Sequence, residues 1–183
     1  MEVSEINKRM IRNVFLNTEI LINEGEKEIF EYDIQAFMFL FLKRHLKGTN
    51  LTVGREKAGK VDCVVFEKSA DDSDDTPIVY YEIKTYFKSH EAIKQSDFNK
   101  DIEKLAELVS KNPKSSGYFF TAGLTEKFKD EGEVKTLPFI ASHLNNEKTW
   151  AEWELPNKNI VRLKPGRKEY RGTCTIMMWK IVI

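Results

Sequence analysis

The spacing of apolar and polar positions predicts two helices at the start of the chain. Apolar residues recur at helical intervals over residues 4–23, and the Gly25 region that follows indicates a break. A second helix is predicted over residues 28–47, where Gly48 is a candidate C-terminal cap. Because residues 37–41 are almost entirely apolar, we expect this second helix to be mostly buried.

The next stretch predicts strands with one helix inserted among them. Three runs have strand character and are separated by turn-forming segments: residues 51–55, 60–66 and 78–84. They suggest a three-stranded meander. A helix follows, with apolar residues at helical spacing: Phe98, Ile102, Leu105 and Val109. Asn112-Pro113 ends this helix, and residues 117–122 have the apolar character of a buried strand. The order from residue 28 is therefore helix, three strands, helix, strand.

The last third of the chain predicts short elements. In order they are a polar helix over residues 125–131, a strand over 134–141, a segment around Trp150 and Trp153, and two terminal strands over 160–163 and 174–183. No internal repeat or flexible linker interrupts the pattern. A chain of 183 residues suits one domain with a real core, so residues 1–183 are interpreted as a single α/β domain.

Composition excludes several classes of protein. The 29 basic and 29 acidic residues give a formal charge of zero, so any contact with nucleic acid must be local. Cys63 and Cys174 stand far apart, which fits a reducing compartment and no disulfide framework. The longest apolar run, residues 36–42, is too short to cross a bilayer. We expect a cytoplasmic protein without a membrane partner.

The candidate chemistry lies on two neighbouring predicted strands. Strand side chains alternate between faces, so Glu82 and Lys84 project together, and Asp62 stands on the strand before them. Charges on a buried strand are expensive unless paired or coordinated, so they indicate a structural ion pair or a catalytic centre. A second acid-x-Lys triplet, at Glu133 and Lys135, sits in a charged stretch with no such context.

At these residues the chain resembles the PD-(D/E)xK nuclease superfamily, to which many restriction endonucleases belong. The resemblance covers residues 28–122 and leaves 123–183 as a C-terminal extension. It implies a restriction endonuclease-like core, which is a central mixed β-sheet flanked by helices in the order α-β-β-β-α-β, here with an N-terminal helix and C-terminal strands added. The family motif maps onto Asp62, Glu82 and Lys84. Val61 stands where the family's name implies proline.

Many members of that superfamily add a glutamate on the first helix, often with a glutamine a few residues later. Glu31, followed by Gln35, matches that pattern, although an acid in the first turn of a helix is also favoured by the macrodipole alone. The resemblance implies that Mg²⁺ or Mn²⁺ is held by Asp62, Glu82 and the Ile83 carbonyl, with Glu31 assisting. Lys84 would orient the attacking water and stabilise the transition state.

The function that the resemblance implies is hydrolysis of phosphodiester bonds by a magnesium-dependent endonuclease. DNA is the expected substrate, RNA remains open, and restriction, defence and repair roles are all compatible. So small and neutral a chain is expected to act as a homodimer or as the catalytic subunit of a larger complex. The alternative is a non-catalytic nucleic-acid-binding or scaffold module with the same fold.

Two basic stretches are candidates for contact with a nucleic-acid backbone. The first is on the helix after Lys84, where Lys100, Lys104 and Lys111 lie opposite the apolar stripe. Glu103 and Glu107 interrupt that face and favour a solvated surface. The second runs through the region of the predicted terminal strands and comprises Lys158, Arg162, Lys164, Arg167, Lys168 and Arg171. An ordinary exposed hairpin explains the second stretch equally well.

Overall fold

The structure is a computed structural model. It describes residues 3–25, 28–57, 61–69, 75–87, 95–128, 140, 143, 151–154, 160–171 and 173–183. For residues 56, 57, 95, 97, 167, 170 and 171 within these ranges, only the backbone is described.

The described chain is α/β, with helices on both faces of a mixed sheet. In chain order the elements are α1 (Val3–Asn23), α2 (Glu31–His45), β1 (Leu51–Lys57), β2 (Val61–Glu67), β3 (Thr76–Tyr86), α3 (Gln95–Lys111), β4 (Ser116–Leu124), α4 (Thr125–Phe128), β5 (Ala151–Glu154), β6 (Ile160–Arg171) and β7 (Cys174–Val182). The predicted order of helix, three strands, helix and strand is thus confirmed from α2 to β4.

Within the described residues the sheet contains seven strands, in the order β1-β2-β3-β4-β7-β6-β5. β1, β2 and β3 pair antiparallel, which is the predicted meander. β4 pairs parallel to β3, so α3 forms the crossover that a parallel pair requires. The remaining pairs, out to β5 at the far edge, are antiparallel. The sheet is therefore mixed, with its one parallel pair at the centre.

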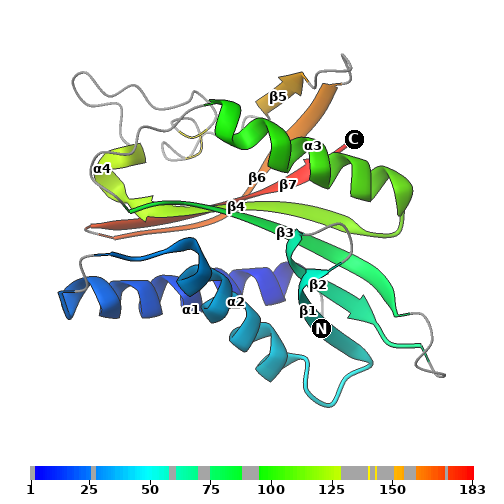
Figure 1. Cartoon of the computed structure of the whole chain (residues 1–183), viewed down its shortest axis with the longest axis horizontal. Helices are drawn as coiled ribbons and strands as arrows, with labels where there is room; N and C mark the ends of the chain where they lie inside the picture. Colours follow the sequence, from blue (N-terminus) through cyan, green and yellow to red (C-terminus); the bar gives the residue numbers. More distant parts are fainter. Residues whose placement is uncertain are drawn as a thin grey trace.

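The two faces of the sheet carry separate cores, and helices cover each one (Figure 1). α1 and α2 pack on one face with the side chains of Tyr81 and Ile83 from β3. The Tyr81 hydroxyl donates to Asn7 Oδ1 over 2.7 Å and ties α1 to the sheet. α3 packs on the opposite face with Tyr80 and Tyr86. By strand alternation, Glu82 and Lys84 therefore lie on the α3 face.

α2 departs from the sequence expectation in its boundaries and its buried side. The helix begins at Glu31 and is capped at Leu46, so Gly48, with φ of 82°, lies in the turn beyond the cap. The expectation of a mostly buried helix is wrong for Leu40, which is 61% exposed. A run that is apolar on all sides does not indicate which side faces the sheet, and here Met38 and Leu42 do so.

The C-terminal elements agree in part with the predictions. β6 extends over Ile160–Arg171, well beyond the predicted 160–163. Most of the strand predicted over residues 134–141 lies outside the described residues, and Ile140, which is described, has helical conformation. Among the described helices, none is both long enough and apolar enough to cross a membrane.

Candidate active site

The predicted site residues meet where β2 stops pairing with β3. The pairing of the two strands ends at Cys63 and Tyr81. Just beyond it, the Ile83 N–H donates to Asp62 Oδ2 over 2.7 Å, so a carboxylate takes the position of a strand partner. The N–H and C=O of one strand residue point to the same side, so the Ile83 carbonyl faces this edge too. An open strand edge thus gathers an acid and a backbone oxygen.

Glu31 reaches the same edge from the first turn of α2. The backbone of Thr85 donates a hydrogen bond to the Glu31 carboxylate, and the nearby charge of Asp62 raises the pKa of Glu31. Thr85 is two residues after Ile83, so the backbone groups of both residues point to the same edge. The edge of β3 therefore carries Asp62 and Glu31 next to each other.

Asp62 is held from a second direction by polar side chains of α2 and β1. Gln35 Nε2 donates to Asp62 Oδ1 over 2.8 Å. Arg55 Nη2 in turn donates to Gln35 Oε1 over 3.2 Å. Both oxygens of Asp62 are thereby bonded, which fixes the orientation of the carboxyl group. Gln35 is buried, so its amide has a defined position in the site.

Glu82 and Lys84 do project together, as predicted, and both meet α3. The Lys104 ammonium contacts Glu82 Oε1, and the Glu82 side chain is only 3% exposed. Lys84 Nζ lies 3.8 Å from Asp101 Oδ2, and Lys104 Nζ lies 3.9 Å from Asp101 Oδ1. Asp101 therefore sits between two lysines, one from β3 and one from its own helix.

Burial raises the pKa of Asp62, Glu82 and Glu31. Burial, reinforced by the charge of Asp62, raises the pKa of Glu82 to about 9, although Lys104 opposes the shift. Burial and Asp62 likewise raise the pKa of Glu31 to about 7, against Lys84. The pKa of Asp62 is raised by burial but less so, because hydrogen bonds from Ile83 and Glu82 favour its charged form. At neutral pH the site therefore carries fewer negative charges than it has carboxyl groups.

The donor set fits a hard divalent cation through two carboxylates and not three. Among the described residues, no three His, Cys, Asp or Glu side chains form a group that could hold a metal. Glu31 thus does not complete a triad with Asp62 and Glu82. The hydrogen bond between Asp62 and Glu82 nevertheless brings their oxygens together beside the Ile83 carbonyl. Mg²⁺ takes one or two carboxylates and fills its other positions with water and substrate oxygens, so this set suffices.

The candidates for contact with nucleic acid are dispersed. On α3, Lys100 is exposed, whereas Lys104 turns into the acidic cluster. On β6, Arg162 and Lys164 are exposed, and Arg162 lies 3.6 Å from Glu152 of β5. Lys168 instead donates to the backbone oxygen of His143 over 2.7 Å. Lys158 lies outside the described residues, and the side chains of Arg167 and Arg171 are not described.

The sequence patterns do not predict the positions of Asp101 and Lys104 in the site. Asp101 was not singled out, because one acid on an amphipathic helix gives no signal until the rotation of that helix over the sheet is known. Lys104 was placed on a solvated basic stripe together with Lys100 and Lys111. Its distance of three residues from Asp101 on one helical face was the available clue. Searches against protein-family models and curated proteins find no match to this chain.

Proposed function

We propose that this protein is a metal-dependent nuclease with a restriction endonuclease-like core, cleaving phosphodiester bonds of DNA. The observation that carries the proposal is the meeting of Asp62, Glu82, Lys84 and Glu31 at one end of β3. These residues come from α2, β2 and β3. Each buried acid costs desolvation energy, so several acids buried together indicate a common site.

The order of elements supports the same proposal. α2, β1, β2, β3, α3 and β4 follow one another as the core of that superfamily requires, with β3 and β4 parallel and adjacent. The motif acids fall on β2 and β3, and Glu31 on the helix before them. α1 and the strands β5 to β7 are additions at the two ends of this core.

The chemistry assigns a task to each side chain. Asp62 and Glu82, with the Ile83 carbonyl, would hold Mg²⁺ or Mn²⁺. When bound, the cation supplies positive charge to the phosphate and makes a water easier to deprotonate. Gln35 fixes Asp62, so the carboxylate is oriented before substrate arrives. Glu31, with a pKa of about 7, can accept a proton at neutral pH.

Lys84 and Lys104 are the two lysines that bring positive charge to the site. The Lys84 side chain is 33% exposed, so it can contact a phosphate oxygen while Asp101 restrains it. Lys104 contacts Glu82, and its 31% exposure leaves it within reach of solvent and substrate. Asp101 acts as a positioning residue, because it lies near both ammonium groups.

The test is cleavage of plasmid, single-stranded DNA and RNA with Mg²⁺ or Mn²⁺. The parent protein should cleave DNA, and Lys84→Ala should lose at least about a hundredfold in rate, as expected when a group that stabilises transition-state charge is removed. Lys111→Ala is the matched control, since that lysine lies in solvent on α3 and pairs only with Glu107 in the described contacts. Equal cleavage by the parent and Lys84→Ala would remove the assignment. Binding of DNA by a parent that never cleaves it would favour the non-catalytic module instead.

A further inference from the structure

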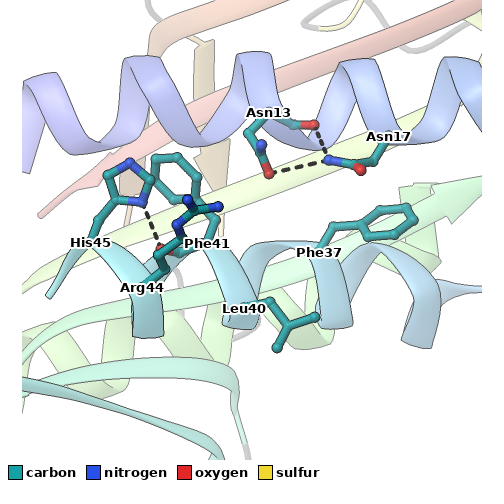
Figure 2. Close-up of a pocket in the computed structure, with 7 residues that line it drawn as sticks. All are labelled: Asn13, Asn17, Phe37, Leu40, Phe41, Arg44 and His45. Atoms are coloured by element: carbon teal, nitrogen blue, oxygen red, sulfur yellow. Dashed lines mark hydrogen bonds between the residues drawn. The ribbon is translucent and has the colours of Figure 1, made fainter. Parts of the chain in front are cut away.

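The outward side of α1 and α2 exposes several large apolar side chains. Leu16 and Ile20 of α1 are 46% and 53% exposed, and Leu40 of α2 is 61% exposed. Phe37 of α2 is partly exposed beside them. Figure 2 shows Phe37 and Leu40 on α2 below Asn13 and Asn17 of α1. We call this the α1/α2 face. Contiguous exposed apolar side chains on adjacent helices are typical of an interaction surface.

The α1/α2 face is hollowed along its middle. A depression of about 230 Å³ lies between the helices, and its lining comprises Asn13, Asn17, Phe37, Leu40, Phe41, Arg44 and His45. The Asn17 amide donates to the Asn13 carbonyl over 2.8 Å, so these polar groups are already partly satisfied within α1. A shallow groove with both apolar and polar walls can receive the side chains of another helix.

Charges segregate to opposite ends of the α1/α2 face. The helices run antiparallel, because Asn13 and Arg44 lie toward one end and Asn17 and Phe37 toward the other (Figure 2). The basic end carries Arg12 on α1, and Arg44 and Lys47 at the end of α2. The acidic end carries Glu19 and Glu24, in the last turns of α1 and just after it, together with Asp33 in the first turn of α2.

The helix macrodipole does not explain this distribution on α1. A dipole favours acids at the start of a helix and bases at its end. α2 follows that rule, with Glu31 and Asp33 in its first turn and Lys43, Arg44 and His45 in its last. α1 has only Glu5 in its first turn and no basic residue in its last turn, while Glu19 lies close to its end. The charges of α1 thus require another reason.

We propose that a second copy of this chain docks on the α1/α2 face about a two-fold axis perpendicular to the helices. Such an axis places the basic end of one copy on the acidic end of the other, which makes the face complementary to itself. Leu16, Ile20 and Leu40 of both copies then bury one another at the centre. The result is a four-helix layer between two sheets.

The dimensions of the face suit a homodimer. α2 has 15 residues and is therefore about 22 Å long, and two packed helices are about 20 Å wide. The flat footprint is roughly 450 Å² per copy, so two copies bury about 900 Å², which is the size of a weak, reversible dimer interface. α3 lies on the opposite face of the sheet, so a partner on the α1/α2 face does not cover it (Figure 1).

The first test is the mass in solution, measured by sedimentation velocity and light scattering over a dilution series. The parent should be a dimer at about 100 µM, and Leu40→Lys should raise the dissociation constant at least about tenfold by burying a charge at the centre of the interface. Ile160→Lys is the matched control, because Ile160 is 56% exposed on β6 and belongs to neither helix of the α1/α2 face, so the dimer should be unchanged. A monomeric parent, or a dimer equally unaffected by Leu40→Lys and Ile160→Lys, would overturn the proposal.

The second test exploits the charge pattern and does not depend on one apolar side chain. A basic-end variant, Arg12→Glu with Arg44→Glu, and an acidic-end variant, Glu19→Lys with Glu24→Lys, should each be monomeric, since each face then carries one sign of charge. An equal mixture of the two should form a heterodimer. Failure of the mixture to associate, with both variants folded by circular dichroism, would contradict end-for-end docking.

Discussion

Two lysines on the same helix, seven positions apart, form ion pairs with glutamates in opposite surroundings. Lys111 contacts Glu107 one turn earlier on α3, and the two side chains are 66% and 62% exposed. Lys104 contacts Glu82 of β3, whose side chain is almost completely buried beside Asp62. The first pair lies in solvent, and the second closes a cluster of acids.

The difference shows which charges of this chain demand a functional explanation. A solvated pair one turn apart contributes a few tenths of a kcal/mol and costs little, so its presence needs no further reason. A buried carboxyl beside a second acid costs desolvation energy that one lysine offsets only in part. Its retention therefore points to a use, and a divalent cation with a phosphate is the use that its oxygen donors fit.

The largest predicted effect is on binding of the cation. Asp62→Asn should lower the affinity for Mg²⁺ or Mn²⁺ by about a hundredfold or more, because one of the two carboxylates is lost. Gln35→Ala should lower it by about tenfold, since that side chain only orients Asp62. Glu107→Gln should have no effect. Isothermal titration measures all three, and unchanged affinity in Asp62→Asn would contradict the assigned ligand.

The next effect is on folding stability. Lys104→Met should lower the free energy of unfolding at pH 7 by about 1–2 kcal/mol, less than the usual loss for a broken buried pair because Glu82 can remain protonated. Lys111→Met should change it by less than about 0.5 kcal/mol. Urea denaturation of both variants gives the comparison. Equal losses would mean that the buried pair is no more coupled than the exposed one.

A smaller effect is the pH dependence of stability without divalent cations. The pKa of Glu82 is raised from 4.5 to about 9 on folding, so its contribution is fully present below pH 4.5 and is lost as pH rises to about 9. The pKa of Glu31 is raised to about 7, and its contribution is lost over a lower range. The parent should lose stability up to about pH 9, whereas Glu82→Gln should stop losing it near pH 7. Melting temperatures across this range test the difference; the same decline in both proteins would contradict the raised pKa of Glu82.

Much of the fold could be predicted because local periodicity encodes it. Period-two runs located β1 to β3, and the spacing of Phe98, Ile102 and Leu105 located α3. The common side of Glu82 and Lys84 followed from strand alternation alone. The side of α2 that faces the sheet could not be predicted, because residues 37–41 are nearly all apolar and leave no polar stripe to orient the helix.

The rest of the candidate site depends on contacts between elements distant in sequence. Sequence spacing grouped Lys104 with Lys100 and Lys111, because nothing local records how far α3 is rotated over β3. The structure separates Lys104, which meets Glu82, from Lys111, which meets Glu107. Asp101 joins the site for the same reason. Residues on strands were thus easier to predict than residues on the helix that covers them.

The most direct test of the central claim is the rate of DNA cleavage with Mg²⁺ in two matched variants, Glu82→Gln and Glu107→Gln. Both replace a lysine-paired glutamate by its uncharged isostere. We predict that Glu82→Gln loses at least about a thousandfold, because a cation ligand is removed, while Glu107→Gln keeps the parent rate. Equal rates in the two variants would contradict the claim that the buried acids of β2 and β3 perform the chemistry.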